Sequence, residues 1–522
     1  MKRLIAPVLI GALFSSFAMA KDMDMKAEIE ALKAQMKELK AAQKKINIKS
    51  LKRQLLEVKA HDAHDNIKFS ADLRTSYDVI DYKLNHTPDM RGNVAHDASA
   101  GIWTNKFILK MAAQPRDDLV FHGALGVYKT FGYNGVQPYN SFQNMDWYAD
   151  ETPSGDANFR LKEAYFIYFG NMGKVPYTVS LGRRPSVNGF LTNYRDDEDK
   201  PASPIGHNIN MEFDGASFMW QLENVTGISG QYFKICLGRG NSNADAKYPG
   251  FDNYMGKQGL NGISPSATQT PYVQSDLNSA NMDLAGIIMK LYDDGQYTVM
   301  FNWFKAWNMM GTNFGYHKGL NDVNGTTGAD GYDANLVDVG DMTGGALSFQ
   351  SSGIGDGIND FLDDTNVFAS FAWSKTDPKG KHGIINPMTG VVEQVTEMLG
   401  STKSETGTSY YVGVNFPCLL VDGARWGLEY NHGSKYWRSF DYGEDTLVGS
   451  KLSARGNAYE VFYDLPLLNK FLTAQVRYTY IDYAYTGSDM FFGSTGAPMD
   501  VDTTPGAVKS ASDLRLSIRY RY

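Results

Sequence analysis

Hydrophobic and polar residues alternate one by one through much of this chain. The last eleven residues show the pattern most clearly, because polar residues separate Leu514, Leu516, Ile518, Tyr520 and Tyr522. A period of two is that of a β-strand with two unlike faces. The pattern predicts a terminal strand, either at the edge of a soluble all-β domain or in the wall of a membrane barrel.

The same alternation recurs in fifteen further segments: residues 67–77, 103–111, 119–131, 161–169, 177–184, 211–220, 232–237, 282–292, 297–305, 342–349, 367–375, 410–416, 424–432, 459–465 and 472–480. With the terminal strand they make about sixteen strands, with 14 or 18 as alternatives. An even number is expected for a single-chain bacterial barrel.

The connections between these segments alternate between long and short. The long ones are residues 81–98, 132–157, 187–206, 240–280, 308–340, 376–407, 433–455 and 486–511, and only the link at 351–363 fits neither class. Outer-membrane barrels have long external loops and short periplasmic turns, whereas a soluble sandwich has no reason to keep this order. We therefore predict an all-β fold, a transmembrane antiparallel β-barrel over residues 66–522.

The first twenty residues have the composition of a secretory signal peptide. Lys2 and Arg3 give a positive start, residues 4–17 are mostly apolar, and residues 18–20 form an Ala-Met-Ala cleavage pattern. Beyond them, no segment approaches the roughly 18 apolar residues that a membrane-spanning helix needs. If the mature chain spans a membrane, closed β-strands must do so.

Residues 21–60 contain no Gly, Pro or aromatic residue and are rich in Ala, Lys, Glu and Leu. Ile29, Leu32, Met36 and Leu39 are spaced like the a and d positions of a heptad. The spacing predicts a short α-helical coiled coil, or a single amphipathic helix that rests on the barrel. The segment carries 11 Lys and Arg against 6 Asp and Glu. We expect a periplasmic arm whose charge favours contact with the anionic cell wall, the peptidoglycan.

Several acidic or histidine-containing segments allow two interpretations. Residues 61–65, with two His and two Asp, form either a solvated linker or a metal site. The Asp-rich runs at 330–338 and 356–364 are either solvated loops or calcium sites, and neither has EF-hand spacing. The solvated interpretation is favoured in each case, and we predict no catalytic residue, metal or cofactor.

The chain has only two cysteines, Cys236 and Cys418, and no Cys-rich motif. Cys236 has the polar parity of its strand, and Cys418 falls in a short turn several strands further along. A sixteen-strand wall keeps them beyond the Cα separation of about 7 Å that a disulfide allows, so we expect two free thiols. The net charge of −8 gives no reason to expect a nucleic-acid partner.

If the apolar parity of each strand faces lipid, the polar parity faces the channel. The basic residues of that parity are Lys68, Arg74, Lys106, Lys110, Lys162, Arg184, Arg477, Arg515, Arg519 and Arg521. The acidic ones are Glu212, Asp214, Asp283, Glu429 and Glu460, with Arg425 as an exception among them. Since closure brings the first and last strands together, we predict a wall that is basic on one side and acidic on the other.

Three segments resemble recurring strands of Gram-negative porins. They are Leu161-Lys162-Glu163-Ala164-Tyr165, Leu181-Gly182-Arg183-Arg184-Pro185 and Phe213-Asp214-Gly215-Ala216. The terminal strand also resembles the C-terminal assembly signal of outer-membrane barrels, although those chains usually end in Phe and this one ends in Tyr522. The plan of signal peptide, short coil and barrel is similar to porin-like families known only as domains of unknown function.

The resemblance implies a passive diffusion channel in the outer membrane, surrounded by lipid and lipopolysaccharide and commonly trimeric. In such porins the loop after the fifth strand folds inward and narrows the pore. Here that loop carries Asp196, Asp197, Glu198 and Asp199. Folded inward, these acids would face the wall arginines across water, and the transverse field would sort ions weakly. The other interpretation is a solvated external tip that divalent cations bridge to lipopolysaccharide.

Two other classes of function are compatible with the sequence. A structural or adhesive protein would use the coiled coil to hold the barrel on the cell wall. A barrel enzyme is less favoured, because the chain has no G-x-S-x-G nucleophile elbow and its nine histidines are scattered. A single-channel conductance measurement would separate a channel from a structural protein.

Overall fold

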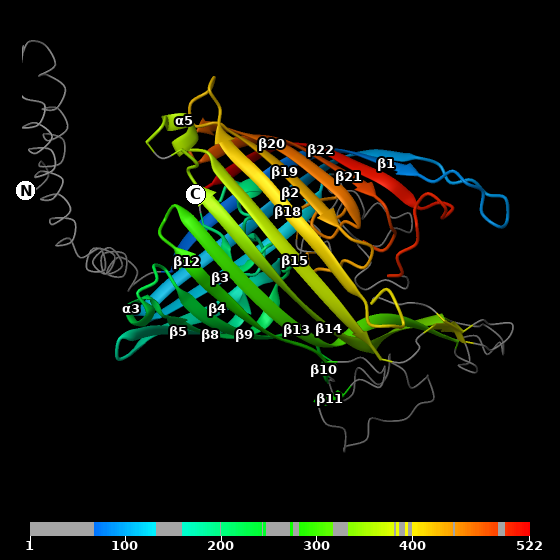
Figure 1. Ribbon diagram of the computed structural model, residues 1–522, viewed down its shortest axis with the longest axis horizontal. Helices are drawn as coiled ribbons and strands as arrows, with labels where there is room; N and C mark the ends of the chain where they lie inside the picture. Colours follow the sequence, from blue (N-terminus) through cyan, green and yellow to red (C-terminus); the bar gives the residue numbers. More distant parts are fainter. Residues whose placement is uncertain are drawn as a thin grey trace, which may run out of the picture. The chain divides into compact units, whose positions relative to one another are not determined.

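A computed structural model describes residues 67–131, 159–198, 200–242, 244–246, 272–274, 281–316, 332–355, 357–379, 383–385, 392–394, 399–441, 444–488 and 496–522. The predicted signal peptide, arm and linker lie outside these residues, as does Asp199. Within them, sixteen antiparallel strands form one closed barrel (Figure 1). The predicted fold class and strand number are therefore confirmed.

The barrel strands, in their order around the wall, are β1 (Lys68–Leu84), β2 (Ala98–Arg116), β3 (Leu119–Thr130), β4 (Arg160–Met172), β5 (Val175–Arg184), β8 (Phe213–Gln221), β9 (Tyr232–Asn241), β12 (Met282–Asp293), β13 (Tyr297–Tyr316), β14 (Tyr332–Ser352), β15 (Asn366–Pro378), β18 (Thr406–Pro417), β19 (Arg425–Gly433), β20 (Gly456–Leu468), β21 (Leu472–Tyr483) and β22 (Val508–Arg521). Each predicted segment overlaps one of these strands.

The smaller elements lie in the connections: β6 (Gly189–Phe190), η3 (Tyr194–Asp196), β7 (Ala202–Ile205), α3 (Glu223–Thr226), β10 (Ala244–Ala246), β11 (Tyr272–Gln274), α5 (Asp360–Asp363), β16 (Gly383–Ile385) and β17 (Val392–Gln394). The C-terminus lies at the same end of the barrel as the links that carry α3 and α5, at the left in Figure 1. No helix among the described residues is long and apolar enough to cross a membrane.

Strand β22 closes the barrel against β1. Leu514, Leu516 and Tyr520 pair with Val79, Tyr77 and Leu73. Leu516 and Ile518 are 47% and 52% exposed, whereas Arg515 and Arg477 on the opposite face are 2% and 1% exposed. Apolar side chains therefore point outward and polar ones inward, which is the inverse of a soluble barrel and the arrangement of a barrel in lipid.

Tyrosines form a continuous outward row across β18 to β21. The ring centroids of Tyr410 and Tyr430 are 6.0 Å apart, those of Tyr430 and Tyr459 are 5.2 Å apart, and those of Tyr459 and Tyr480 are 6.5 Å apart. Tyrosine rings with one polar end are typical of the boundary between membrane and water. The row therefore marks such a boundary on this part of the wall.

Two connections fold into the barrel and give it an interior core. The first inward loop, residues 185–212, follows β5, and the second inward loop, residues 434–455, follows β19. Leu191 and Ile205 of the first loop and Trp437 and Leu452 of the second are buried in one apolar cluster with wall residues. The second loop had been predicted to lie outside the barrel, and that prediction is wrong.

Both cysteines are free, as predicted. Cys236 lies on β9 with the inward parity of Lys234, which is 5% exposed. Cys418 lies in the link between β18 and β19.

Candidate functional site

The first inward loop meets the basic wall directly. The Arg519 Nη2 lies 3.3 Å from Glu198 Oε1, and the Arg521 Nη2 lies 2.6 Å from Asp197 Oδ2. Arg519 also donates to the backbone oxygen of Asp196 at 2.7 Å. Asp197 and Glu198 therefore bond directly to the arginines of β22, which differs from both interpretations of the sequence, acids that face the arginines across water or a solvated external tip.

His207 anchors the other end of the first inward loop. Its ring is fully buried, with Nδ1 at 2.8 Å from the Ser370 hydroxyl and Nε2 at 2.9 Å from the Ser409 hydroxyl. Burial lowers the pKa of His207 to about 3, so the ring is neutral at neutral pH. The histidine therefore fastens the loop to β15 and β18 without adding charge to the interior.

Three charged residues of the second inward loop form ion pairs inside the barrel. Asp445 accepts hydrogen bonds from Arg74 at 2.5 and 2.9 Å, from Lys106 at 2.9 Å and from Arg515 at 3.1 Å. Lys451 is paired with both Glu429 of β19 and Glu460 of β20. Glu444 is paired with Arg195 of the first inward loop.

These contacts set the charge state of Asp445. Burial alone would raise its pKa, but Lys106, Arg74 and Arg515 outweigh burial and hold the pKa of Asp445 well below its usual range. The carboxylate is therefore ionised at every physiological pH, and it ties the second loop to β1, β2 and β22.

The two inward loops also bond to each other through their backbones. The amide of Asn210 donates to the oxygen of Phe440 at 2.7 Å, and the amide of Phe440 donates to the oxygen of Asn208 at 3.0 Å. With the buried pair between Arg195 and Glu444, these bonds join the loops into one block inside the lumen. The lumen of the barrel is therefore narrowed by two interlocked loops and not by the first loop alone.

Most of the predicted inward basic residues do point inward, and they meet acids that the sequence prediction had missed. Arg519 is bonded to Asp72 at 2.5 and 2.8 Å, and Arg515 is paired with Asp78. Both aspartates share the parity of Arg74, so the alternation contained the signal. The wall near β1 and β22 is therefore mixed in charge rather than simply basic. No comparable signal marked Arg195, Glu444, Asp445 or Lys451, because the loops have no periodicity.

A strip of the inner wall on β2, β3 and β4 stays open to solvent. Lys110 is exposed and Tyr128 is 63% exposed. Gly126 and its neighbour Ile108 on β2 are buried between them, although a Cβ added at Gly126 would meet nothing within 4 Å. Lys162 of β4 is paired here with Glu212 at the end of the first inward loop. Lys68 is exposed at the start of β1, and Arg184 is half-buried at the end of β5. We call the surface around Lys110, Gly126, Tyr128 and Lys162 the open strip.

Asp214 and Asp283 had been predicted to face the channel, and both point outward. Asp214 pairs with Arg183 at 3.2 Å, and Asp283 pairs with Arg239 at 2.7 Å. In β8 the inward position belongs to Phe213, whose ring packs edge-on against Phe440 of the second inward loop. An apolar side chain can face inward here because the loops supply an apolar core.

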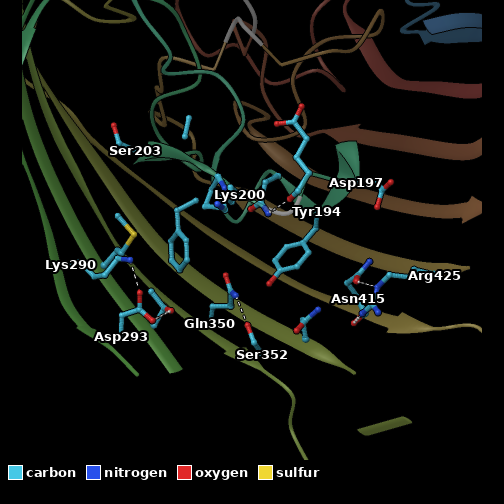
Figure 2. Close-up of a pocket in the computed structure, with 18 of the residues that line it drawn as sticks. Tyr194, Asp197, Lys200, Ser203, Lys290, Asp293, Gln350, Ser352, Asn415 and Arg425 are labelled. Atoms are coloured by element: carbon cyan, nitrogen blue, oxygen red, sulfur yellow. Dashed lines mark hydrogen bonds and ion pairs between the residues drawn. The ribbon is translucent and has the colours of Figure 1, made fainter. Parts of the chain in front are cut away.

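A cavity of about 680 Å³ lies between the first inward loop and the wall (Figure 2). Tyr194 and Lys200 line it from the loop, and Figure 2 shows the Tyr194 ring projecting into it. On the wall, Lys290 is paired with Asp293 at 2.6 Å, and Arg425 donates to Asn415 at 2.6 Å. The lining therefore mixes apolar side chains with polar ones, and several of its charges are paired. Among the described residues, no cluster of His, Cys, Asp and Glu could hold a metal ion.

Solved structures similar to this chain are outer-membrane proteins. The OmpF of Salmonella typhi in complex with daunomycin is 10% identical over 88% of this chain and 99% of its own, with a TM-score of 0.41. An anion-selective porin from Comamonas acidovorans gives the same four values. OprB of Pseudomonas putida is 12% identical over 89% of this chain and 96% of its own, with a TM-score of 0.40.

No curated protein matches the chain. The model of one protein family, described as Protein of unknown function (DUF3373), matches residues 97–522. Because the match covers most of the chain, this protein is a member of the DUF3373 family.

Proposed function

We propose that the protein is an outer-membrane channel through which small hydrophilic solutes and ions diffuse, rather than an enzyme or a purely structural barrel. The observation that carries the proposal is the open strip, a charged and solvent-exposed part of an interior that two loops partly fill. An exposed ionisable side chain on the inner wall is in contact with water, as the lining of a water-filled channel is, and a purely structural barrel has no need for it.

The interlocked loops make the channel narrow and set its ion preference. The open strip carries Lys110 and the paired Lys162, and ions that pass it experience a field that is little screened inside the barrel. The first inward loop, which is acidic, carries the charge opposite to that of the open strip and pairs with it through Glu212. We therefore expect a small conductance with a weak preference between anions and cations.

The test is a planar-bilayer recording of the purified protein in a salt gradient. Replacing Lys110 by Glu should shift the reversal potential toward cations, since the substitution reverses one charge on the open strip. Lys375→Glu is the matched control, because Lys375 is exposed and shares the outward parity of Phe371 on β15. An equal shift in both variants would mean that the open strip does not border the conducting path. No conductance from folded protein would reject the channel and leave the structural role.

A further inference from the structure

Four basic side chains from four different strands converge on Asp445. Arg74 comes from β1, Lys106 from β2, Arg477 from β21 and Arg515 from β22. The Asp445 carboxylate accepts two hydrogen bonds from Arg74, one from Lys106 and one from Arg515. Arg477 and Arg515 also donate to the backbone oxygen of Asp445 at 2.7 and 3.1 Å. We call these four side chains the cation nest.

Two cations of the nest depend on Asp445 for their charge balance. Arg515 is paired with Asp78 and also lies 4.0 Å from Asp513, and Arg477 lies 3.9 Å from Glu460, which Lys451 shares. Among the ion pairs of the described residues, Arg74 and Lys106 have Asp445 as their one acidic partner. Removing Asp445 would leave uncompensated cations in a buried site, which is costly unless an anion replaces it.

The nest also has hydrogen-bond donors to spare. Arg477 is 1% exposed, and neither its Nε nor its Nη1 has a hydrogen-bond partner among the described residues. The Nε of Arg74 is likewise buried without a partner there. A single carboxylate has two oxygens, so an oxyanion with three or four oxygens could use donors that Asp445 leaves idle.

We propose that the cation nest is a binding site for small oxyanions of the phosphate and carboxylate class, and that Asp445 is a tethered carboxylate that occupies the site until a solute anion displaces it. The proposal rests on the proposed function in one respect, since the solute reaches the nest through the lumen. Asp445 belongs to a stretch of the second loop that has no helix or strand, so the carboxylate is held by the nest rather than by local structure.

The tether sets the concentration at which a free anion can compete. A short flexible segment would give the tethered group an effective concentration of roughly a millimolar, and the pair between Glu444 and Arg195 holds Asp445 more firmly than that. The wild-type chain should therefore bind inorganic phosphate only at millimolar concentrations or above. Asp445→Ala should bind it at least about tenfold more tightly, because the competing carboxylate is gone. The backbone bonds from Arg477 and Arg515 remain in that variant and keep the loop in place.

The measurement is titration calorimetry with inorganic phosphate on the full chain, in an uncharged detergent and a phosphate-free buffer. The double variant Asp445→Ala with Arg477→Met should bind phosphate at least about tenfold more weakly than Asp445→Ala, because it lacks one charge-assisted donor. Glu444→Gln is the matched control in the same loop: it weakens the contact with Arg195 and leaves the nest intact, so its phosphate affinity should stay well below that of Asp445→Ala. Circular dichroism reports whether each variant is folded.

Absence of phosphate binding to folded Asp445→Ala would overturn the site, and so would equal affinity in the variant that also lacks Arg477. The wild-type chain tests the displacement of Asp445 directly. If it does not bind phosphate at concentrations up to about 1 M, a free anion does not displace the tethered carboxylate. These results are independent of conduction. A protein that binds phosphate but does not conduct keeps the nest and loses the channel, and one that conducts without binding phosphate loses only the nest.

Discussion

At the scale of single residues, Asp441 differs from the other acids of the inward loops. It is fully buried, and neither carboxylate oxygen has a hydrogen-bond partner among the described residues. Burial raises the pKa of Asp441 well above its usual range, although the Ser439 side chain opposes this rise to a smaller extent and the neighbouring Glu444 adds to it. Asp445, four residues later, is shifted in the opposite direction because cations surround it. One short loop therefore holds one carboxyl that stays protonated and one that stays ionised.

The raised pKa of Asp441 predicts how stability depends on pH. Above about pH 4 the unfolded chain loses this proton while the folded chain keeps it, so folding is progressively disfavoured as pH rises toward the folded pKa. Asp441→Asn cannot titrate, and its apparent Tm should fall less between pH 5 and pH 8 than that of the wild type. Thermal unfolding followed by circular dichroism in detergent measures both slopes. Parallel curves would mean that Asp441 is not protonated in the folded protein.

At the scale of elements, glycines allow the wall to turn into the second inward loop. A Cβ at Gly433, the last residue of β19, would lie 2.1 Å from the Ala454 oxygen. Gly456, the first residue of β20, has a φ of +146°, and a Cβ there would lie 2.2 Å from the Asp482 oxygen. Side chains larger than hydrogen do not fit at either position without a backbone shift. At both ends of the second inward loop, a glycine therefore allows the close backbone contacts that its path into the lumen requires.

The acids of the first inward loop hold that loop against the wall, which predicts the effect of removing them. Replacing Asp197 by Asn and Glu198 by Gln removes the charge that pairs with Arg521 and Arg519. These pairs are partly exposed and each is worth about 1 kcal/mol or less, so the barrel should remain folded while the loop is held less tightly. We expect a larger single-channel conductance and a shift of selectivity toward anions.

The matched control for this variant neutralises Asp214 and Asp283 together. These acids carry the same charges but lie on the outward face. Bilayer recordings should give the wild-type conductance and reversal potential for the control. If the loop variant also behaves like the wild type, the first inward loop does not border the conducting path.

At the scale of the whole molecule, the wall could be predicted from the sequence and the interior could not. Strand period and loop rhythm come from local alternation, and they located all sixteen strands. The rule that polar residues face the lumen gave the wrong orientation where the interior is apolar. Phe213 faces inward because Phe440, distant in sequence, packs against it. The cation nest escaped prediction for a related reason. Its basic members follow strand parity, but Asp445 lies in an irregular loop. The contacts of Asp445 with four different strands form only when the barrel closes, and no local pattern predicts them.

The arm at residues 21–60 lies outside the described residues, and its role remains a prediction. Its a and d residues Ile29, Leu32, Met36 and Leu39 need partners to bury them. Deleting residues 22–59 should weaken a homo-oligomer, a trimer in the simplest case, or reduce retention on the cell wall. Native gels and peptidoglycan pull-down measure the two effects. If neither changes, the arm serves only as a spacer.

The contacts between the inward loops and the wall also imply an order of events during assembly. Glu198 and Arg519 are 321 positions apart in the chain, and Arg195 and Glu444 are 249 apart. Such distant partners meet only after most of the intervening chain has found its place, because closing a long loop costs entropy before any contact rewards it. We therefore expect the lumen of a newly inserted barrel to be wide at first, and to become narrow when the two inward loops dock in the last step of folding. A cell that makes this protein would face a brief leak with every copy it inserts.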